Sequence, residues 1–278
     1  MTMLKFTMMH TNLIKIKAIL IKHTENLTPK CASSTGRLKK AFMDLVYPSN
    51  IYCICCGEPI FEEELYSLCK ACTEKIAWVN QKSCAKCGKM LQDWYEPEFC
   101  IDCSYVKHHF KQGFCCVQYG ELERQLVHQL KYHGKGYIGR KLAEMMQDRI
   151  SFENLDIQYI IPVPIHKLKL RERGYNQASL IGKNLAAGLN WTYCDSLLIR
   201  TKDTEPMNQL RPRERRRNMQ NAFALGKKTK DLVRDKSILI VDDIFTTGST
   251  VDACSEVLLA AGAKEVYVFT FAAGVNEK

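Results

Sequence analysis

The second half of the chain alternates apolar runs of strand length with longer segments of helical periodicity. Leu122, Leu126 and Leu130 recur at helical spacing, and the run GRKLAEMMQDRI extends that pattern. The short apolar run QYIIPVP, the helix-like YNQASLIGKNLAAGL and a strand-like stretch around residues 193–199 follow. The chain then runs through KSILIVDDIF, the helical GSTVDACSEVLLAAG closed by Gly262, and the strand-like EVYVFTFAA. Strands that alternate with helices predict an α/β domain whose mostly parallel sheet is covered by helices on both faces.

The pattern is different before residue 113. Residues 1–42 show weak periodicity and no capped helix, so we expect a leader that is disordered or that precedes the physiological start near Met43. Residues 43–112 are rich in cysteine and poor in large apolar side chains. The pattern therefore predicts a leader at 1–42, a cysteine-rich domain at 43–112 and an α/β domain at 113–278.

The net charge of +10 does not by itself indicate a nucleic-acid partner. Residues 1–42 hold eight Lys and Arg and one Glu, and the other 236 residues hold 32 basic and 29 acidic side chains, which leaves only +3 there. No apolar run approaches the ~18 residues of a membrane-spanning helix, so we expect no membrane span.

The cysteines form a duplicated metal-binding pattern. The spacing C-x2-C-x12-C-x2-C occurs twice, 31 residues apart, and its members are Cys53, Cys56, Cys69, Cys72, Cys84, Cys87, Cys100 and Cys103. Without a secretory signal, such pairs favour metal binding in a reducing cytoplasm over disulfides, iron–sulfur clusters or redox chemistry. Four thiolates complete the tetrahedral shell of a structural Zn²⁺, so we expect two zinc sites, with sequential pairing favoured over cross-braced pairing. Cys55 is a substitute ligand for its neighbour Cys56.

A ligand site is expected where the strand Ile238–Val241 ends. Asp242 and Asp243 follow it, and after two apolar residues the small-residue loop Thr246–Thr250 opens a helix. Open α/β sheets bind ligands beyond the carboxyl ends of their strands, and N–H groups at a helix N-terminus surround a phosphate. Paired carboxylates suit sugar hydroxyls and Mg²⁺. The pattern therefore predicts a phosphorylated-sugar site.

The run ILIVDDIFTTGST closely resembles the diphosphoribosyl-binding motif of type I phosphoribosyltransferases. The resemblance implies that Asp242 and Asp243 hold the ribose hydroxyls of phosphoribosyl pyrophosphate (PRPP), together with Mg²⁺. It places the 5-phosphate on the loop residues Thr246, Thr247, Gly248, Ser249 and Thr250. Purine-type members usually carry Asp where this chain has Thr246, so purine salvage is not implied.

Other segments resemble the ComF/GntX branch of that family, and the resemblance covers residues 43–278. It implies a type I phosphoribosyltransferase-like, mostly parallel sheet flanked by helices and preceded by a small zinc-ribbon domain with four cysteine ligands at each zinc. The implied pyrophosphate loop is Pro162, Val163, Pro164, His166 and Lys167. The branch motif is carried by Arg171, Arg173, Gly174, Asn176 and Gln177. Further elements are Lys131 with Gly134, and the basic segment with Arg213, Arg215, Arg216, Arg217, Asn218 and Phe223. Met207 stands where the branch commonly has Gln.

Two functions remain open. In the first, which we favour, the protein assists uptake or processing of transforming single-stranded DNA alongside a helicase and a recombination mediator, as the resemblance implies. Basic clusters at 167–173 and 211–217 then track the DNA backbone, while Tyr175 or Phe223 stacks a base. In the second, the protein is a phosphoribosyltransferase whose acceptor and catalytic base are unknown. Each basic cluster also has a simpler interpretation as a solvated helix face.

Overall fold

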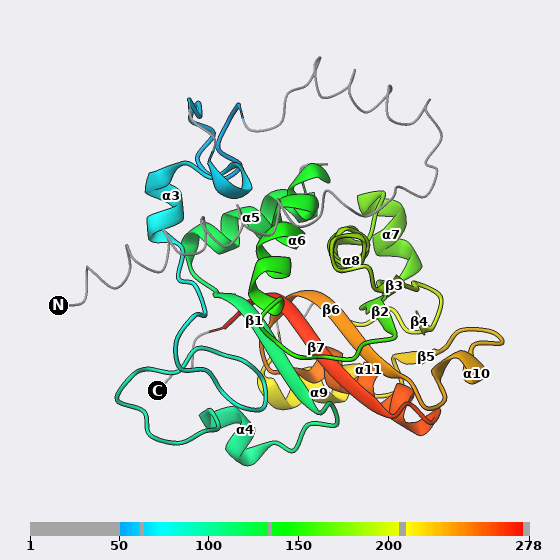
Figure 1. The fold of residues 1–278 in the computed structure, drawn as a ribbon. Helices are drawn as coiled ribbons and strands as arrows, with labels where there is room; N and C mark the ends of the chain where they lie inside the picture. The colour runs from blue at the N-terminus through cyan, green and yellow to red at the C-terminus, as the bar shows by residue number, and fades with distance from the viewer. Residues whose placement is uncertain (1–50, 62–63, 133–134, 206–209, 275–278) are drawn as a thin grey trace, which may run out of the picture. The chain divides into compact units, whose positions relative to one another are not determined.

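The structure is a computed structural model that describes residues 51–61, 64–132, 135–205 and 210–274 (Figure 1). The chain divides into one compact unit at 1–49 and another at 50–278, and every described residue belongs to the second. The expected leader and the expected start at Met43 lie outside the described residues, as do Gly134 and Met207.

One sheet of five strands organises the described unit. Its spatial order is β1-β7-β6-β2-β3, and all neighbouring strands are parallel. The strands are β1 (Gln112–Gln118), β2 (Tyr159–Pro162), β3 (Thr192–Tyr193), β6 (Ser237–Phe245) and β7 (Glu265–Ala273). Because β6 and β7 lie in the interior of the sheet, their apolar runs are buried on both faces. The predicted parallel α/β sheet is therefore confirmed.

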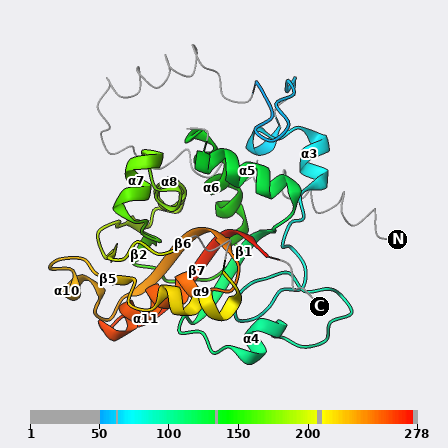
Figure 2. The same cartoon turned by 180° about the vertical axis from the view of Figure 1, so that it is seen from behind.

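Helices cover both faces of this sheet (Figures 1 and 2). One face carries α5 (Glu121–Tyr132), α6 (Tyr137–Ile150) and α8 (Gln177–Leu189), and the other carries α9 (Pro212–Met219) and α11 (Ser249–Ala260). Alternate residues of β6 divide between the two cores, as the pleat of a strand requires. Leu239 and Val241 pack with α5, α6 and α8, whereas Ile238 and Ile240 pack with α11. Two short helices, α7 (Lys167–Arg173) and α10 (Lys230–Val233), complete this domain.

Two sequence-based expectations need correction. The strand-like stretch at 193–199 is divided between β3 in the main sheet and β4 (Leu198–Arg200), which pairs in antiparallel fashion with β5 (Phe223–Leu225). Asp242 and Asp243 lie within β6 rather than after it, because β7 continues beside them and pairs with the strand as far as Phe245.

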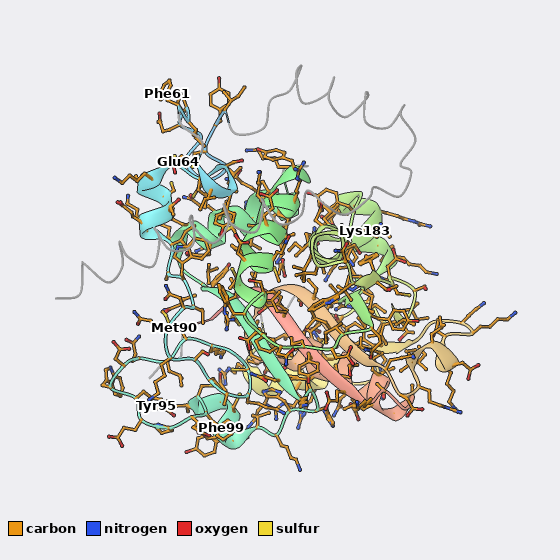
Figure 3. The ribbon with its side chains drawn as sticks, viewed as in Figure 1. Phe61, Glu64, Met90, Tyr95, Phe99 and Lys183 are labelled. Carbon is orange, nitrogen blue, oxygen red and sulfur yellow. The ribbon has the colours of Figure 1, made fainter. Side chains whose placement is uncertain are left out.

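The cysteine-rich region forms two ribbons that join opposite faces of the sheet. It contains the short helices η1 (Leu65–Ser67), α3 (Lys70–Lys75) and α4 (Ile101–Tyr105). Leu68 of the first ribbon belongs to the core on the α5 and α6 face, while Leu91 of the second belongs to the core on the α11 face. Figure 3 shows Phe61 on the first ribbon, and Tyr95 beside Phe99 on the second. Among the described residues, no helix is long and apolar enough to cross a membrane.

Candidate functional site

The acidic pair lies at the end of β6, against a lysine from α5. The Lys131 Nζ atom is 2.6 Å from Asp243 Oδ2, and the carboxylate Oδ1 of Asp242 accepts a hydrogen bond of 2.9 Å from the Asp243 backbone N–H. Asp243 is buried and Asp242 is half-buried. The structure therefore gathers three of the expected site residues from two distant parts of the chain.

Burial controls the ionisation of this group. Burial, together with the charge of Asp243, raises the pKa of Asp242 from 3.8 to about 8. Burial opposes the charge of Lys131, yet the carboxylates of Asp243 and Asp242 raise its pKa above the ordinary value. Asp242 therefore binds a proton more readily than an exposed carboxylate does.

The small-residue loop lies beside this pair and leads directly into α11. Thr246 is exposed, and the hydroxyls of Thr247 and Ser249 are 2.7 Å apart. Gly248 has φ +73°, and a Cβ there would lie 2.7 Å from the ring of Phe245. Glycine is required at this position for both reasons. The first N–H groups of α11 have no carbonyl partner within the helix, so this loop can accept an anion.

Four cations from three elements lie within electrostatic range of the acidic pair or of one another. Lys131 pairs with Asp243, and the charge of Asp242 acts on Arg200, at the end of β4. Lys169 is repelled by Arg200 and Arg173, and Arg173 repels Lys131. Burial lowers the pKa of Arg200 and, together with the charge of Arg200, that of Lys169. We call these four residues, Lys131, Lys169, Arg173 and Arg200, the cation ring.

Sequence reasoning missed Arg200 and counted Lys169 only as part of a basic run. Arg200 belongs to no recognisable motif. The sequence shows it only as a basic residue at the end of a short strand. Its position depends on the β4–β5 pairing, and its guanidinium lies 5.5 Å from the ring centroid of Phe223.

The expected pyrophosphate loop connects β2 to α7. Pro162 is the last residue of β2, and the Val163 backbone N–H donates to the Val241 carbonyl at 2.9 Å. His166 precedes α7 directly, and its Nδ1 atom is 3.3 Å from Asp203 Oδ1. Pro164 is half-buried and Lys167 is exposed. The loop therefore begins beside β6, one strand away from the acidic pair.

Part of the branch motif has a structural role. Gly174 ends α7 with φ +78°, and the Asn176 side chain accepts from the Ala178 N–H while donating to the Val163 carbonyl. Arg173 donates to the buried Gln177 at 3.2 Å, and its guanidinium lies 5.2 Å from the ring centroid of Tyr132. Arg171 is exposed.

The basic segment forms the helix α9. Arg213, Arg216 and Arg217 are exposed, whereas Arg215 is half-buried and its Nε donates to the Leu210 carbonyl at 2.9 Å. The Asn218 side chain exchanges two hydrogen bonds with the backbone of Glu205. Since Asp203 lies against His166, the segment 203–205 bridges α9 and α7.

The two residues expected to stack on a base are both used in packing. Phe223 is 5% exposed, and the Tyr175 hydroxyl donates to the Leu130 carbonyl at 2.5 Å while its ring packs against the core. Both side chains are apolar enough to be recruited into the core, which the sequence pattern did not reveal. Tyr132, beside Arg173, is 56% exposed.

The eight paired cysteines form two clusters, each from one consecutive block. The first holds Cys53, Cys56, Cys69 and Cys72, and the second holds Cys84, Cys87, Cys100 and Cys103. The sulfur atoms within each cluster lie within 4.8 Å of one another. The blocks are therefore arranged sequentially rather than cross-braced.

The geometry of both clusters fits zinc. The Cys56–Cys69 and Cys87–Cys100 sulfur distances are each 3.7 Å, close to the ~3.8 Å edge of a tetrahedron with ~2.3 Å Zn–S bonds. Every described cysteine is free, so disulfides do not join them. Hydrogen bonds from the Cys100, Cys103 and Cys87 thiols hold the pKa of Cys84 far below its ordinary value. The donor set therefore suits structural zinc.

Cys55 lies outside both clusters. Its thiol donates to Gln125 Oε1 at 3.7 Å, and burial raises its pKa to about 11. The expected substitute-ligand role is therefore not used in this structure.

Comparisons with known proteins match both halves of the chain. The double zinc ribbon domain model matches residues 42–104, and the phosphoribosyl transferase domain model matches residues 181–277. Competence protein F of Haemophilus influenzae is 30% identical over 210 residues, which cover 74% of this chain and 90% of that protein. DNA utilization protein YhgH of Salmonella typhimurium is 33% identical over 221 residues, which cover 73% of this chain and 95% of that protein.

A solved structure of adenine phosphoribosyltransferase from Saccharomyces cerevisiae is 16% identical, with a TM-score of 0.32, and the match covers 52% of this chain and 72% of that one. The domain matches, the parallel sheet and the two four-cysteine clusters give the architecture as a zinc-ribbon region followed by a phosphoribosyltransferase-type domain. Because the chain covers nine-tenths of a relative that is 30% identical, it belongs to the competence protein F (ComF) family.

Proposed function

We propose that this protein binds PRPP with Mg²⁺ at the carboxyl edge of its sheet and assists the uptake or processing of transforming single-stranded DNA in the cytoplasm. The observation that carries the proposal is the position of the acidic pair, between an anion-accepting loop and the cation ring. A ligand that combines a sugar diol with phosphates at both ends matches that order of groups.

Each part of the site suits one part of PRPP. The loop Thr246–Thr250 would take the 5-phosphate through backbone N–H groups and hydroxyls. Asp242 and Asp243 would take the ribose hydroxyls and, with the pyrophosphate, Mg²⁺. The cation ring and the loop at His166 would take the pyrophosphate.

Unpaired donors support an anionic ligand. Among the described residues, the Nε atoms of Arg173 and Arg200 are buried without a hydrogen-bond partner. Buried donors of charged groups are costly to leave unpaired, so an anion between these side chains would stabilise the site.

The role in DNA uptake rests on the names of the relatives and on exposed basic helices. One relative is named competence protein F, and another is named DNA utilization protein YhgH. Lys167 and Arg171 on α7, with Arg213, Arg216 and Arg217 on α9, offer exposed cations. Tyr132, which is 56% exposed beside Arg173, offers an aromatic ring on which a base could stack. A helicase and a recombination mediator are the expected partners.

A phosphoribosyltransferase activity is the second candidate, and the cation ring favours it. In such a reaction a nucleophile bonds to C1 of PRPP while the C1–O bond breaks and pyrophosphate leaves with the electron pair. Fixed cations around the leaving pyrophosphate would stabilise that charge. The acceptor remains unassigned.

Calorimetric titration tests the proposal directly. The purified protein is titrated with PRPP–Mg²⁺ and, separately, with a short single strand. Changing Asp242→Asn and Asp243→Asn together should weaken PRPP–Mg²⁺ binding at least tenfold, which is about 1.4 kcal/mol. The exposed pair Asp93→Asn and Asp231→Asn gives the same charge change as a control. Equal affinity in the site variant would refute this use of the acidic pair.

A further inference from the structure

The chain segment after the second ribbon reaches the phosphate loop. The His108 side chain is buried; its ring stacks on Phe110 with centroids 4.9 Å apart and meets the Phe245 ring edge-on at 6.2 Å. Phe245 is the residue immediately before Thr246, the start of the loop. His108, which precedes the α/β domain in the sequence, thus packs against the residue from which the expected phosphate loop starts.

His108 also contacts the loop at its glycine. A Cβ added to Gly248 would lie 2.9 Å from His108 Cε1, so the imidazole already occupies the space beside this backbone. Phe245 limits the same space, at 2.7 Å from that Cβ position. The two rings therefore restrict the path of the backbone between residues 245 and 248.

The next residue along holds the first turn of α11. The His109 backbone N–H donates to Asp252 Oδ1 at 2.6 Å, and the His108 Nδ1 atom is 3.6 Å from the same oxygen. Asp252 lies in the first turn of α11, which follows the phosphate loop. Residues 108–110 thus contact the loop on both sides, at Phe245 and at Asp252.

The second cysteine cluster fixes this segment. Lys86, between Cys84 and Cys87, donates to the Phe110 carbonyl. Lys89, which follows the same cysteine turn and is buried, pairs with Asp102 at 2.6 Å and lies 5.7 Å from the Phe245 ring centroid. These contacts depend on the turns that the cluster closes.

The first ribbon packs elsewhere. The Tyr66 hydroxyl donates to Asp148 Oδ2 on α6 at 2.6 Å, and the apolar residues of this ribbon join the core on the α5 and α6 face. The first ribbon is therefore a natural control for the second.

We propose that the second ribbon supports the phosphate loop: its Cys84, Cys87, Cys100 and Cys103 cluster holds His108 against Gly248, and His108 is a positioning residue for phosphate binding. The part of this inference that concerns PRPP rests on the proposed function, whereas the part that concerns the order of the loop does not.

Two variants with matched controls test it. His108→Ala removes the buried ring beside Gly248. His109→Ala removes an imidazole that is 47% exposed and whose Nδ1 atom is 3.3 Å from Asp252 Oδ1, and it keeps the backbone hydrogen bond to Asp252, so it tests the imidazole–Asp252 contact separately from the ring at Gly248. Cys84→Ser opens the second cluster, and Cys53→Ser opens the first. Hydrogen exchange is measured on the ligand-free full chain over a peptide of residues 243–254, and PRPP–Mg²⁺ affinity is measured by calorimetry.

We expect His108→Ala and Cys84→Ser to speed exchange of this peptide about fivefold or more and to weaken PRPP–Mg²⁺ binding by a similar factor. His109→Ala and Cys53→Ser should change either quantity less than about twofold. Unchanged exchange in a folded His108→Ala protein would overturn the inference, as would an equal response to Cys53→Ser. If Cys84→Ser does not fold, His108→Ala decides. A wild-type protein without PRPP affinity would refute the proposed function, while the exchange comparison would still decide this inference.

Discussion

The Lys131 ammonium group lies 2.6 Å from the Asp243 carboxylate and thereby ties the end of α5 to the acidic end of β6. The two side chains are 23% and 11% exposed, so water screens the pair only in part. The ion pair closes the site from the α5 side and balances one of two neighbouring carboxyl groups. Its loss would leave the acidic pair without its nearest cation.

Replacement of this lysine should therefore destabilise the protein. We expect Lys131→Met to lower the free energy of unfolding by about 1–3 kcal/mol, less than for a fully buried pair because both groups reach water. Urea denaturation measures the change. The double variant with Asp243→Asn should recover part of the loss, since it removes the unpaired charge; strictly additive losses would contradict the coupling.

Asp242 should make stability depend on pH. Burial and the charge of Asp243 raise its pKa from 3.8 to about 8, so the folded state binds more protons than the unfolded state between those values. The contribution of this group to stability is therefore complete below about pH 4 and is lost as the pH rises toward 8. Asp242→Asn removes that loss.

The free energy of unfolding of Asp242→Asn, relative to that of wild type, should rise by at least about 1.4 kcal/mol between pH 5 and pH 8. This is the equivalent of one pKa unit. Urea denaturation at both pH values measures it. The exposed substitution Asp231→Asn should follow wild type. An Asp242→Asn advantage that shrinks with rising pH would reverse the sign and refute the assignment.

Much of the fold could be predicted from local patterns. The boundaries of β7 and α8 follow apolar runs and caps such as Asn176, which bonds to a backbone N–H two residues away. The two cysteine clusters likewise follow from spacing, because each C-x-x-C pair closes a local turn.

The rest of the site depends on packing between distant segments. Arg200 lies within electrostatic range of Asp242 because β4 pairs with β5, and His108 reaches Gly248 because the second ribbon joins the α11 face. A single basic residue or a single histidine has no local signal for either interaction. Tyr175 and Phe223 illustrate the opposite error, since each fits a motif but is used in packing.

Metal content should match the two clusters. We expect elemental analysis of the purified protein to give two zinc ions per chain, and a strong chelator to lower its thermal stability. Cys84→Ser should retain the first ion and Cys53→Ser the second, because each cluster takes its ligands from one block. If either single variant lost both zinc ions, the two sites would not be independent.

Two equivalent glycines of the ribbons should respond unequally. Gly57 and Gly88 both have positive φ, +79° and +75°. A Cβ at Gly57 meets nothing within 4 Å, whereas one at Gly88 would lie 2.6 Å from the Gly113 carbonyl of β1. Gly57→Ala should cost about 1–2 kcal/mol of backbone strain, and Gly88→Ala should cost more because the ribbon must also move away from the sheet. Urea denaturation of both variants measures the two losses in free energy of unfolding. Equal losses would refute the close approach of Gly88 to β1.

The exposed arginines of α9 offer a test of the DNA assignment. Arg213, Arg216 and Arg217 are exposed, whereas Arg215 bonds to the Leu210 carbonyl and is left intact to preserve the helix. If the three contact DNA phosphates, their replacement by Ala should weaken single-strand binding and flatten its salt slope by about 0.7 for each lost contact. PRPP–Mg²⁺ affinity should change little, because the acidic pair and phosphate loop are untouched.

A charge-matched control separates local contact from overall charge. Lys227, Lys228 and Lys230 are also exposed, but they precede the start of β6, whereas the phosphate loop follows its end. Their triple replacement by Ala removes the same charge and should leave the salt slope near that of wild type. If both triple variants flatten the slope equally, binding follows net charge and α9 has no special part in it. If the α9 variant instead keeps its DNA affinity and loses turnover, the helix contacts the pyrophosphate during catalysis. That result would support the phosphoribosyltransferase alternative.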